Sequence, residues 1–173
     1  MTSNGPGAVP SFQAAAGGGG GGLTLGTEQS TSSGTSVNFG SIPAGTKQIN
    51  IMFEGSSFTA GTAMAIQIGD AGGIETTEYI STSMGVEVGS AETQSSTNQF
   101  HLAPRAAAGR NHGIMTLLLK DAVNNTWVAT AVINNMTNST IYSAGTKSLS
   151  GELTQVEISG GTFDAGSINI SYQ

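Results

Sequence analysis

The chain has 173 residues, of which 9% are charged, and its 11 acidic and 5 basic side chains give a net charge of −6. This balance disfavours non-specific binding to nucleic acid or anionic lipid, since both are negatively charged. The sequence has no cysteine, which excludes disulfides, thiolate zinc sites and cysteine catalysis. It also has no apolar run of ~20 residues and no signal-peptide pattern, so we expect no membrane insertion and no secretion signal.

The first 22 residues differ in composition from the rest and end in six consecutive glycines. A glycine run of this kind is a flexible tether. A phosphate-binding loop would continue with Lys, Ser or Thr and a helix, whereas Leu23 and a predicted strand follow here. We therefore expect an extended N-terminal arm over residues 1–22, whose candidate attachment residues are Val9, Pro10 and Phe12. The remaining residues, 23–173, form one domain.

After the glycines, turn residues recur roughly every 8–12 residues and no segment has helical periodicity, which is typical of an all-β domain. The clearest strand covers 48–54, where Ile49, Ile51 and Phe53 share one face and only Met52 breaks the alternation. The next covers 64–68, followed by a turn at 70–73. Its predicted inward residues are Met64, Ile66 and Ile68.

A hairpin is predicted over 113–135, with its turn at 121–125. Leu118 lies on the opposite face from its apolar neighbours, which predicts a strand buried on both sides. Two further strands are expected in 153–161 and 166–173. The predicted inward residues of these segments are Met115, Leu117, Leu119, Trp127, Ala129, Ala131, Ile133, Val156, Ile158, Ile168, Ile170 and Tyr172.

Weaker strand signals bring the total to roughly ten short segments, too many for one open sheet. The economical arrangement is an antiparallel two-sheet β-sandwich, jelly-roll-like in character. The weaker signals lie in 23–28, 35–40, 77–89, 98–103 and 139–145.

No pattern of ionisable residues identifies a reaction. Asp70, Glu75 and Glu78 lack the alternating carboxylates of a calcium loop, so a solvated turn is favoured over a metal site. No two carboxylates are singled out as a glycosidase pair, and no Gly-x-Ser-x-Gly motif is present. We expect neither enzymatic activity nor a metal or cofactor.

Both histidines lie in a basic stretch of this acidic chain. His101, Arg105, Arg110 and His112 are predicted to occupy a surface loop, either solvated or docking an acidic partner or glycan; a solvated loop is favoured, and a histidine metal site is disfavoured. The only tryptophan, Trp127, is expected in the core or at an interface between copies rather than as a sugar-stacking platform. The same alternatives apply to Ile168, Ile170 and Tyr172 in the last strand.

Four segments, 25–55, 66–79, 113–133 and 153–173, together resemble a module found in tail-fibre and other virion structural proteins of tailed bacteriophages. The most specific parts are SIPAGTKQI, IGDAGGIETT, NTWVA and FDAGSINI. The segment 2–14 is similar to one that often precedes distal domains in such fibres. The shaft repeats of long fibres are missing here, which indicates a short fibre or tip, or a compact decoration protein.

The resemblance implies a homotrimeric, non-enzymatic virion protein, made in the host cytoplasm and involved in adsorption to the host. The arm would bind other virion proteins, and a host-surface glycan is a further candidate partner. A cysteine-free, low-charge β domain also gains stability by packing against its own copies. Two alternatives stay open: a capsid cement or decoration protein, and a carbohydrate-binding module without attachment to a virion.

Overall fold

The structure is a computed structural model that describes residues 22–103, 109–135 and 139–173. The arm residues Val9, Pro10 and Phe12 and the loop residue Arg105 lie outside the described residues. Every regular element within these ranges is a β-strand, and they contain no helix of a length and polarity to cross a membrane.

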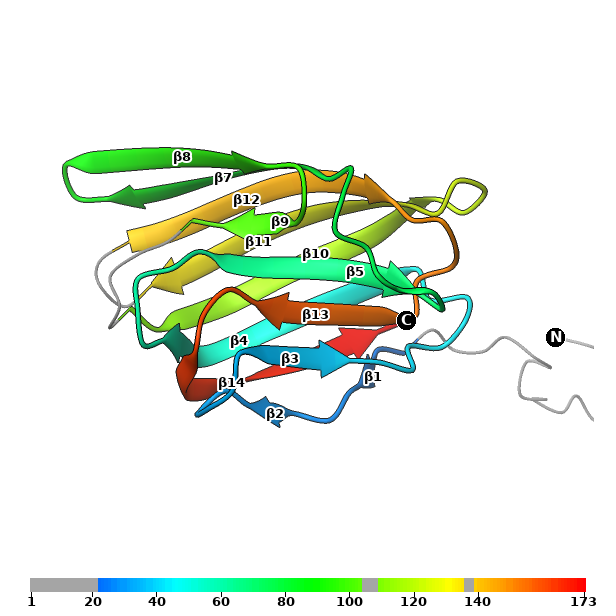
Figure 1. Cartoon of the computed structure of the whole chain (residues 1–173), viewed down its shortest axis with the longest axis horizontal. Coiled ribbons are helices and arrows are strands. Elements are labelled where there is room, and N and C mark those ends of the chain that lie inside the picture. Colours follow the sequence, from blue (N-terminus) through cyan, green and yellow to red (C-terminus); the bar gives the residue numbers. More distant parts are fainter. Residues whose placement is uncertain (1–21, 104–108, 136–138) are drawn as a thin grey trace, which may run out of the picture.

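The strands form two antiparallel sheets, which confirms the predicted β-sandwich (Figure 1). The large sheet has the order β1-β14-β4-β10-β11-β12-β7-β8, with β2 also pairing with β14. Its strands are β1 (Thr24–Leu25), β2 (Gln29–Ser30), β4 (Gln48–Phe58), β7 (Ile80–Glu87), β8 (Ser90–Ser96), β10 (Asn111–Asp121), β11 (Thr126–Asn135), β12 (Ser139–Ser148) and β14 (Phe163–Tyr172).

The small sheet has the order β3-β13-β5-β6, and β9 pairs with β5. Its strands are β3 (Ser36–Phe39), β5 (Met64–Asp70), β6 (Gly73–Ile74), β9 (Phe100–Leu102) and β13 (Gln155–Ser159). The chain crosses between the sheets at β3–β4–β5 and at β12–β13–β14, as in a jelly roll, while the β10–β11–β12 meander widens the large sheet.

One hydrophobic core fills the space between the sheets. Apolar alternation along each strong strand places every second side chain there, because successive residues of a strand point to opposite faces. The inward positions predicted on β4, β5, β10, β11, β13 and β14 are buried, except for Leu119 and Tyr172, which pack at the margin.

Two glycines permit a bulge where β4 pairs with β14. The register shifts between Ala165 and Ser167, and both Gly55 (φ 66°) and Gly166 (φ 85°) have left-handed backbones. A Cβ on Gly166 would lie 2.2 Å from the carbonyl carbon of Gly55, so only glycine fits this crossing.

The two edges of the large sheet are short or polar. At one edge β1 and β2 have two residues each, and at the other β8 has no buried side chain. The exposed Glu92 lies on this second edge strand. Strand β8 was not predicted because, with neither face buried, its sequence has no apolar alternation to detect.

Candidate interaction surface

The outward surface of the large sheet carries an apolar row that crosses neighbouring strands. Met84, Tyr142, Val132 and Ile114 are register partners on β7, β12, β11 and β10, and Met52 of β4 continues the row. The first four are 38%, 47%, 53% and 41% exposed, respectively. Sheet surfaces that face water usually carry polar residues, so this row departs from the ordinary pattern.

The neighbouring rows on the same four strands are also poor in charge. We call the apolar row and its three neighbouring rows on β7, β12, β11 and β10 the outer face. Besides the apolar row, it consists of Ile80, Thr146, Val128 and Leu118; Thr82, Ala144, Thr130 and Thr116; and Val86, Thr140, Asn134 and His112. None of these positions holds Asp, Glu, Lys or Arg. The outer face is therefore broad, partly apolar and without a carboxylate, ammonium or guanidinium group, and the half-buried His112 lies at its margin.

The sequence prediction that Leu118 is buried is wrong within the single chain. Leu118 lies on the outer face and is 45% exposed, since no element of the described chain covers it. Met52, which breaks the alternation of β4, points to the same side of the sheet and lies beside Ile114. The two irregularities thus belong to one surface.

The outward surface of the small sheet shows the ordinary pattern. Asn38, Gln67 and Glu157 are register partners across β3, β5 and β13, and Gln155 lies nearby. The amide of Gln67 donates to the carbonyl of Asn98 at 2.9 Å, and that of Gln155 to the carbonyl of Asp70 at 2.8 Å. This surface is polar and makes hydrogen bonds within its own chain.

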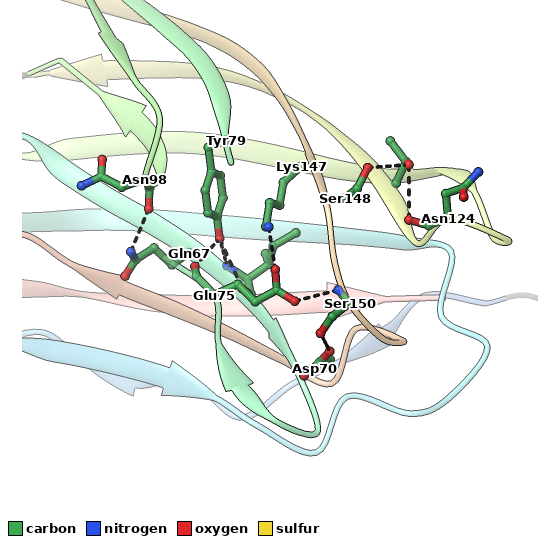
Figure 2. Close-up of polar contacts among 11 residues, drawn as sticks. Gln67, Asp70, Glu75, Tyr79, Asn98, Asn124, Lys147, Ser148 and Ser150 are labelled. Carbon is green, nitrogen blue, oxygen red and sulfur yellow. Dashed lines mark hydrogen bonds and ion pairs between the residues drawn. The ribbon is translucent and has the colours of Figure 1, made fainter. Parts of the chain in front are cut away.

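A second group of polar residues lies at the end of the sandwich where the β5–β6 turn meets the segment after β12 (Figure 2). Lys147 is buried, with its Nζ 2.5 Å from Oε2 of Glu75 and 5.5 Å from the ring centroid of Tyr79. The Tyr79 hydroxyl accepts from the backbone amide of Ile68 at 2.9 Å and donates to the Glu75 carbonyl at 3.0 Å. Burial raises the pKa of Tyr79 to about 12, so its hydroxyl stays protonated.

Both carboxylates of this group are held by Ser150. Its hydroxyl donates to Asp70 at 2.6 Å and its backbone amide to Glu75 at 2.7 Å. The Ser150 hydrogen bond, followed by that from the Gly72 amide, lowers the pKa of Asp70. Burial would raise the pKa of Glu75, but the hydrogen bonds from Lys147 and Ser150 outweigh it and lower that pKa. Because Asp70 is buried and Glu75 is paired, the expected solvated turn is wrong for these two residues, which join the two sheets, whereas Glu78 is exposed as expected.

The predicted surface position of His101 is also wrong. His101 lies in β9 with 7% of its surface exposed, and its Nδ1 is 3.0 Å from the hydroxyl of Ser83. Its backbone amide donates to Ser81 and its carbonyl accepts from Ser143. Burial lowers the pKa of His101, which favours the neutral ring. The small serines of β7 and β12 leave room for the imidazole, a relation that the local sequence does not reveal.

The other basic residues of that stretch are not gathered around His101. Arg110 is exposed, and His112 is half-buried on β10 at the margin of the outer face. Within the described ranges no group of three His, Cys, Asp or Glu residues is arranged to hold a metal ion.

Trp127, Ile168 and Ile170 are 1%, 0% and 3% exposed and point into the core. A sugar-stacking role for Trp127 is therefore wrong, and these three side chains have no surface to offer to a partner copy. Tyr172 is partly buried and lines a groove with Leu25, Asn38 and Phe39 at the open side of the sandwich.

No protein-family model matches the chain, and neither a curated protein nor a solved structure is significantly similar to it.

Proposed function

We propose that this chain is a non-enzymatic structural protein of a tailed-bacteriophage particle. Copies of the sandwich associate as a trimer, and residues 1–16 with the six glycines tether them to other virion proteins. The observation that carries the structural role is the outer face, because a broad exposed apolar surface is typical of a protein contact. The link to phage particles rests on the resemblance of 25–55, 66–79, 113–133 and 153–173 to virion modules.

A tail-fibre role would place the domain beyond the flexible arm, where its loops contact the host surface. Arg110 is an exposed described residue that suits such a contact, whereas the buried His101 is unsuited to it.

A capsid cement or decoration protein is the second candidate, and one observation favours it. A cement protein stabilises a shell through a wide contact surface, and the outer face is wide and uncharged. A carbohydrate-binding role is less well supported, because Trp127 is buried and Tyr142 is the one aromatic residue of the outer face.

The proposal can be tested by electron microscopy of purified particles of a phage whose genome encodes the chain, labelled with a gold-conjugated antibody against residues 23–173. Label at the tail supports the fibre role, and label on the capsid faces supports the decoration role. Particles without label, although the protein is present in the lysate, would exclude a virion component.

The tether can be tested by deleting residues 1–16. We expect the sandwich to keep its fold, because every strand and core residue that the structure describes lies after residue 22. Incorporation into particles, measured by quantitative immunoblot of purified virions, should fall to background. Normal incorporation of the shortened protein would show that the arm is not the tether.

A further inference from the structure

We propose that the outer face of the large sheet is the surface through which one copy of this chain packs against a second copy. This inference rests on the self-association in the proposed function and names the residues that mediate it. At its centre are Met84, Tyr142, Val132 and Ile114, which form an uninterrupted row across four strands.

The distribution of charge favours a second copy as the occupant. The chain carries a net charge of −6, so copies that approach through charged surfaces repel one another. The outer face has no carboxylate and no ammonium or guanidinium group, so two copies meet there without like-charge repulsion. A strongly charged partner would find no complementary charge on this surface to steer it.

The polar side chains of the outer face can also hydrogen-bond to those of a second copy. Thr82, Thr130 and Thr116 flank the apolar row, and a hydroxyl is both a donor and an acceptor. A contact between copies of one surface needs groups that can act in either role, because both sides draw their donors and acceptors from the same set of residues. Two such sheets stack at ~10 Å with their side chains interdigitated.

The dimensions of the outer face are adequate for a specific contact. Four strands ~4.8 Å apart and four rows ~6.8 Å apart cover roughly 500 Å² in projection. The accessible area is larger because the side chains are corrugated, which brings it near the ~600–800 Å² per partner of small specific interfaces.

Two features of the sequence agree with this assignment. Met52 and Leu118 interrupt the alternation expected of strands with one wet side, and both lie on this side of the large sheet. Apolar residues on both sides of a strand are typical of strands that are covered on both sides. A second copy would supply the cover that the described residues do not.

A charge at the centre of the outer face tests the inference. Val132→Glu places a carboxylate at a position that is 53% exposed in the single chain, so the fold should tolerate it. Asn38→Glu adds the same charge at an exposed position on the outward surface of the small sheet and is the matched control. The molar mass of each full-length protein is measured by light scattering over a range of concentrations.

We expect an oligomer for the wild type and for Asn38→Glu. For Val132→Glu we expect an association constant at least ~100-fold lower, because every contact brings two buried like charges together. A monomeric wild type, or a Val132→Glu protein that associates as the wild type does, would overturn the inference. Circular dichroism and thermal unfolding establish that each variant is folded.

A labelling experiment gives a second measurement that does not depend on weakening the contact. The chain has no cysteine, so Val132→Cys and Asn38→Cys each introduce one site for a spin label. Stacked sheets ~10 Å apart should give strong dipolar coupling between copies at position 132 and much weaker coupling at position 38. Equal coupling at the two positions, or none at position 132, would overturn the inference.

The outcomes also separate this inference from the proposed function. A monomeric protein that is still found in phage particles would remove the outer face as a self-contact and leave the virion role. A protein that oligomerises through the outer face but is missing from phage particles would keep the self-contact and remove the virion role. A dimer would support the face and contradict the trimer.

Discussion

Two regions depart from the usual rule that apolar side chains are buried and charged ones exposed: the outer face and the polar group around Lys147. On the outer face, apolar side chains such as Val132 are exposed, whereas at the end of the sandwich the ammonium group of Lys147 is buried. The buried charge has its partners within the chain: Glu75 at 2.5 Å and the ring of Tyr79 at 5.5 Å. The exposed apolar row has none among the described residues.

The two regions differ in the cost of leaving a side chain without a partner. A buried charge without a partner costs several kcal/mol, so the segment after β6 supplies Glu75 to pair with Lys147, and the backbone amide of Ser150 holds Glu75 in place. Leaving an apolar side chain exposed costs little folding free energy, so the domain can fold with the outer face uncovered.

Glu75→Gln should have the largest effect. It leaves the Lys147 ammonium buried without a counterion, which typically costs about 3–5 kcal/mol of unfolding free energy. Urea unfolding at pH 7 measures the loss. Glu157→Gln, on the small-sheet surface, is the control and should change stability by less than ~0.5 kcal/mol.

The double variant Glu75→Gln, Lys147→Met should recover most of this loss, because a buried pair replaced by a less polar one is often near neutral. If the Glu75→Gln variant alone is as stable as the wild type, the Lys147–Glu75 ion pair does not contribute to the unfolding free energy.

Tyr79→Phe should have the next largest effect. It removes the hydroxyl that accepts from the buried Ile68 amide and donates to the partly buried Glu75 carbonyl, and leaves both backbone groups without this partner. The expected cost is about 1–3 kcal/mol. Tyr142→Phe, on the outer face, is a matched control and should have little effect on the unfolding free energy. Equal losses of unfolding free energy for Tyr79→Phe and Tyr142→Phe would contradict the proposed difference between the polar group and the outer face.

Acid should weaken the polar group around Lys147. The pKa values of Asp70 and Glu75 are lowered in the folded chain, so the unfolded chain binds more protons at low pH. Their stabilisation is complete above the unfolded values of about 4 and is lost as pH falls through the folded values. Unfolding free energy measured between pH 7 and pH 2 should fall less steeply for Asp70→Asn. Parallel curves for the variant and the wild type would rule out this role for Asp70.

The outer face should produce the smallest effect, and only through association. The melting temperature of the wild type should rise by about 2 °C for each tenfold increase in protein concentration, because association stabilises the folded state. Val132→Glu should melt at a temperature independent of concentration. A wild type without this dependence would show that the exposed row is left uncovered.

Much of the sandwich could be predicted from the sequence, because strands such as β4 and β13 bury one face and so alternate visibly. The pairing of Lys147 with Glu75 could not, since it depends on strands that are distant in sequence. His101 was misplaced for the same reason: its burial depends on Ser83 and Ser143. Met52 and Leu118 were recognisable as irregular, but only the strand register brings them to one surface.

The edges of the large sheet are unsuited to pairing with a strand of another copy. A sheet that adds strands at an open edge extends without limit, but β1 and β2 are too short to template a neighbour. At the other edge, Glu92 would bring like charges together along β8. If copies meet through the outer face as proposed, neither edge of the large sheet is suited to extend that contact into a fibril by adding strands.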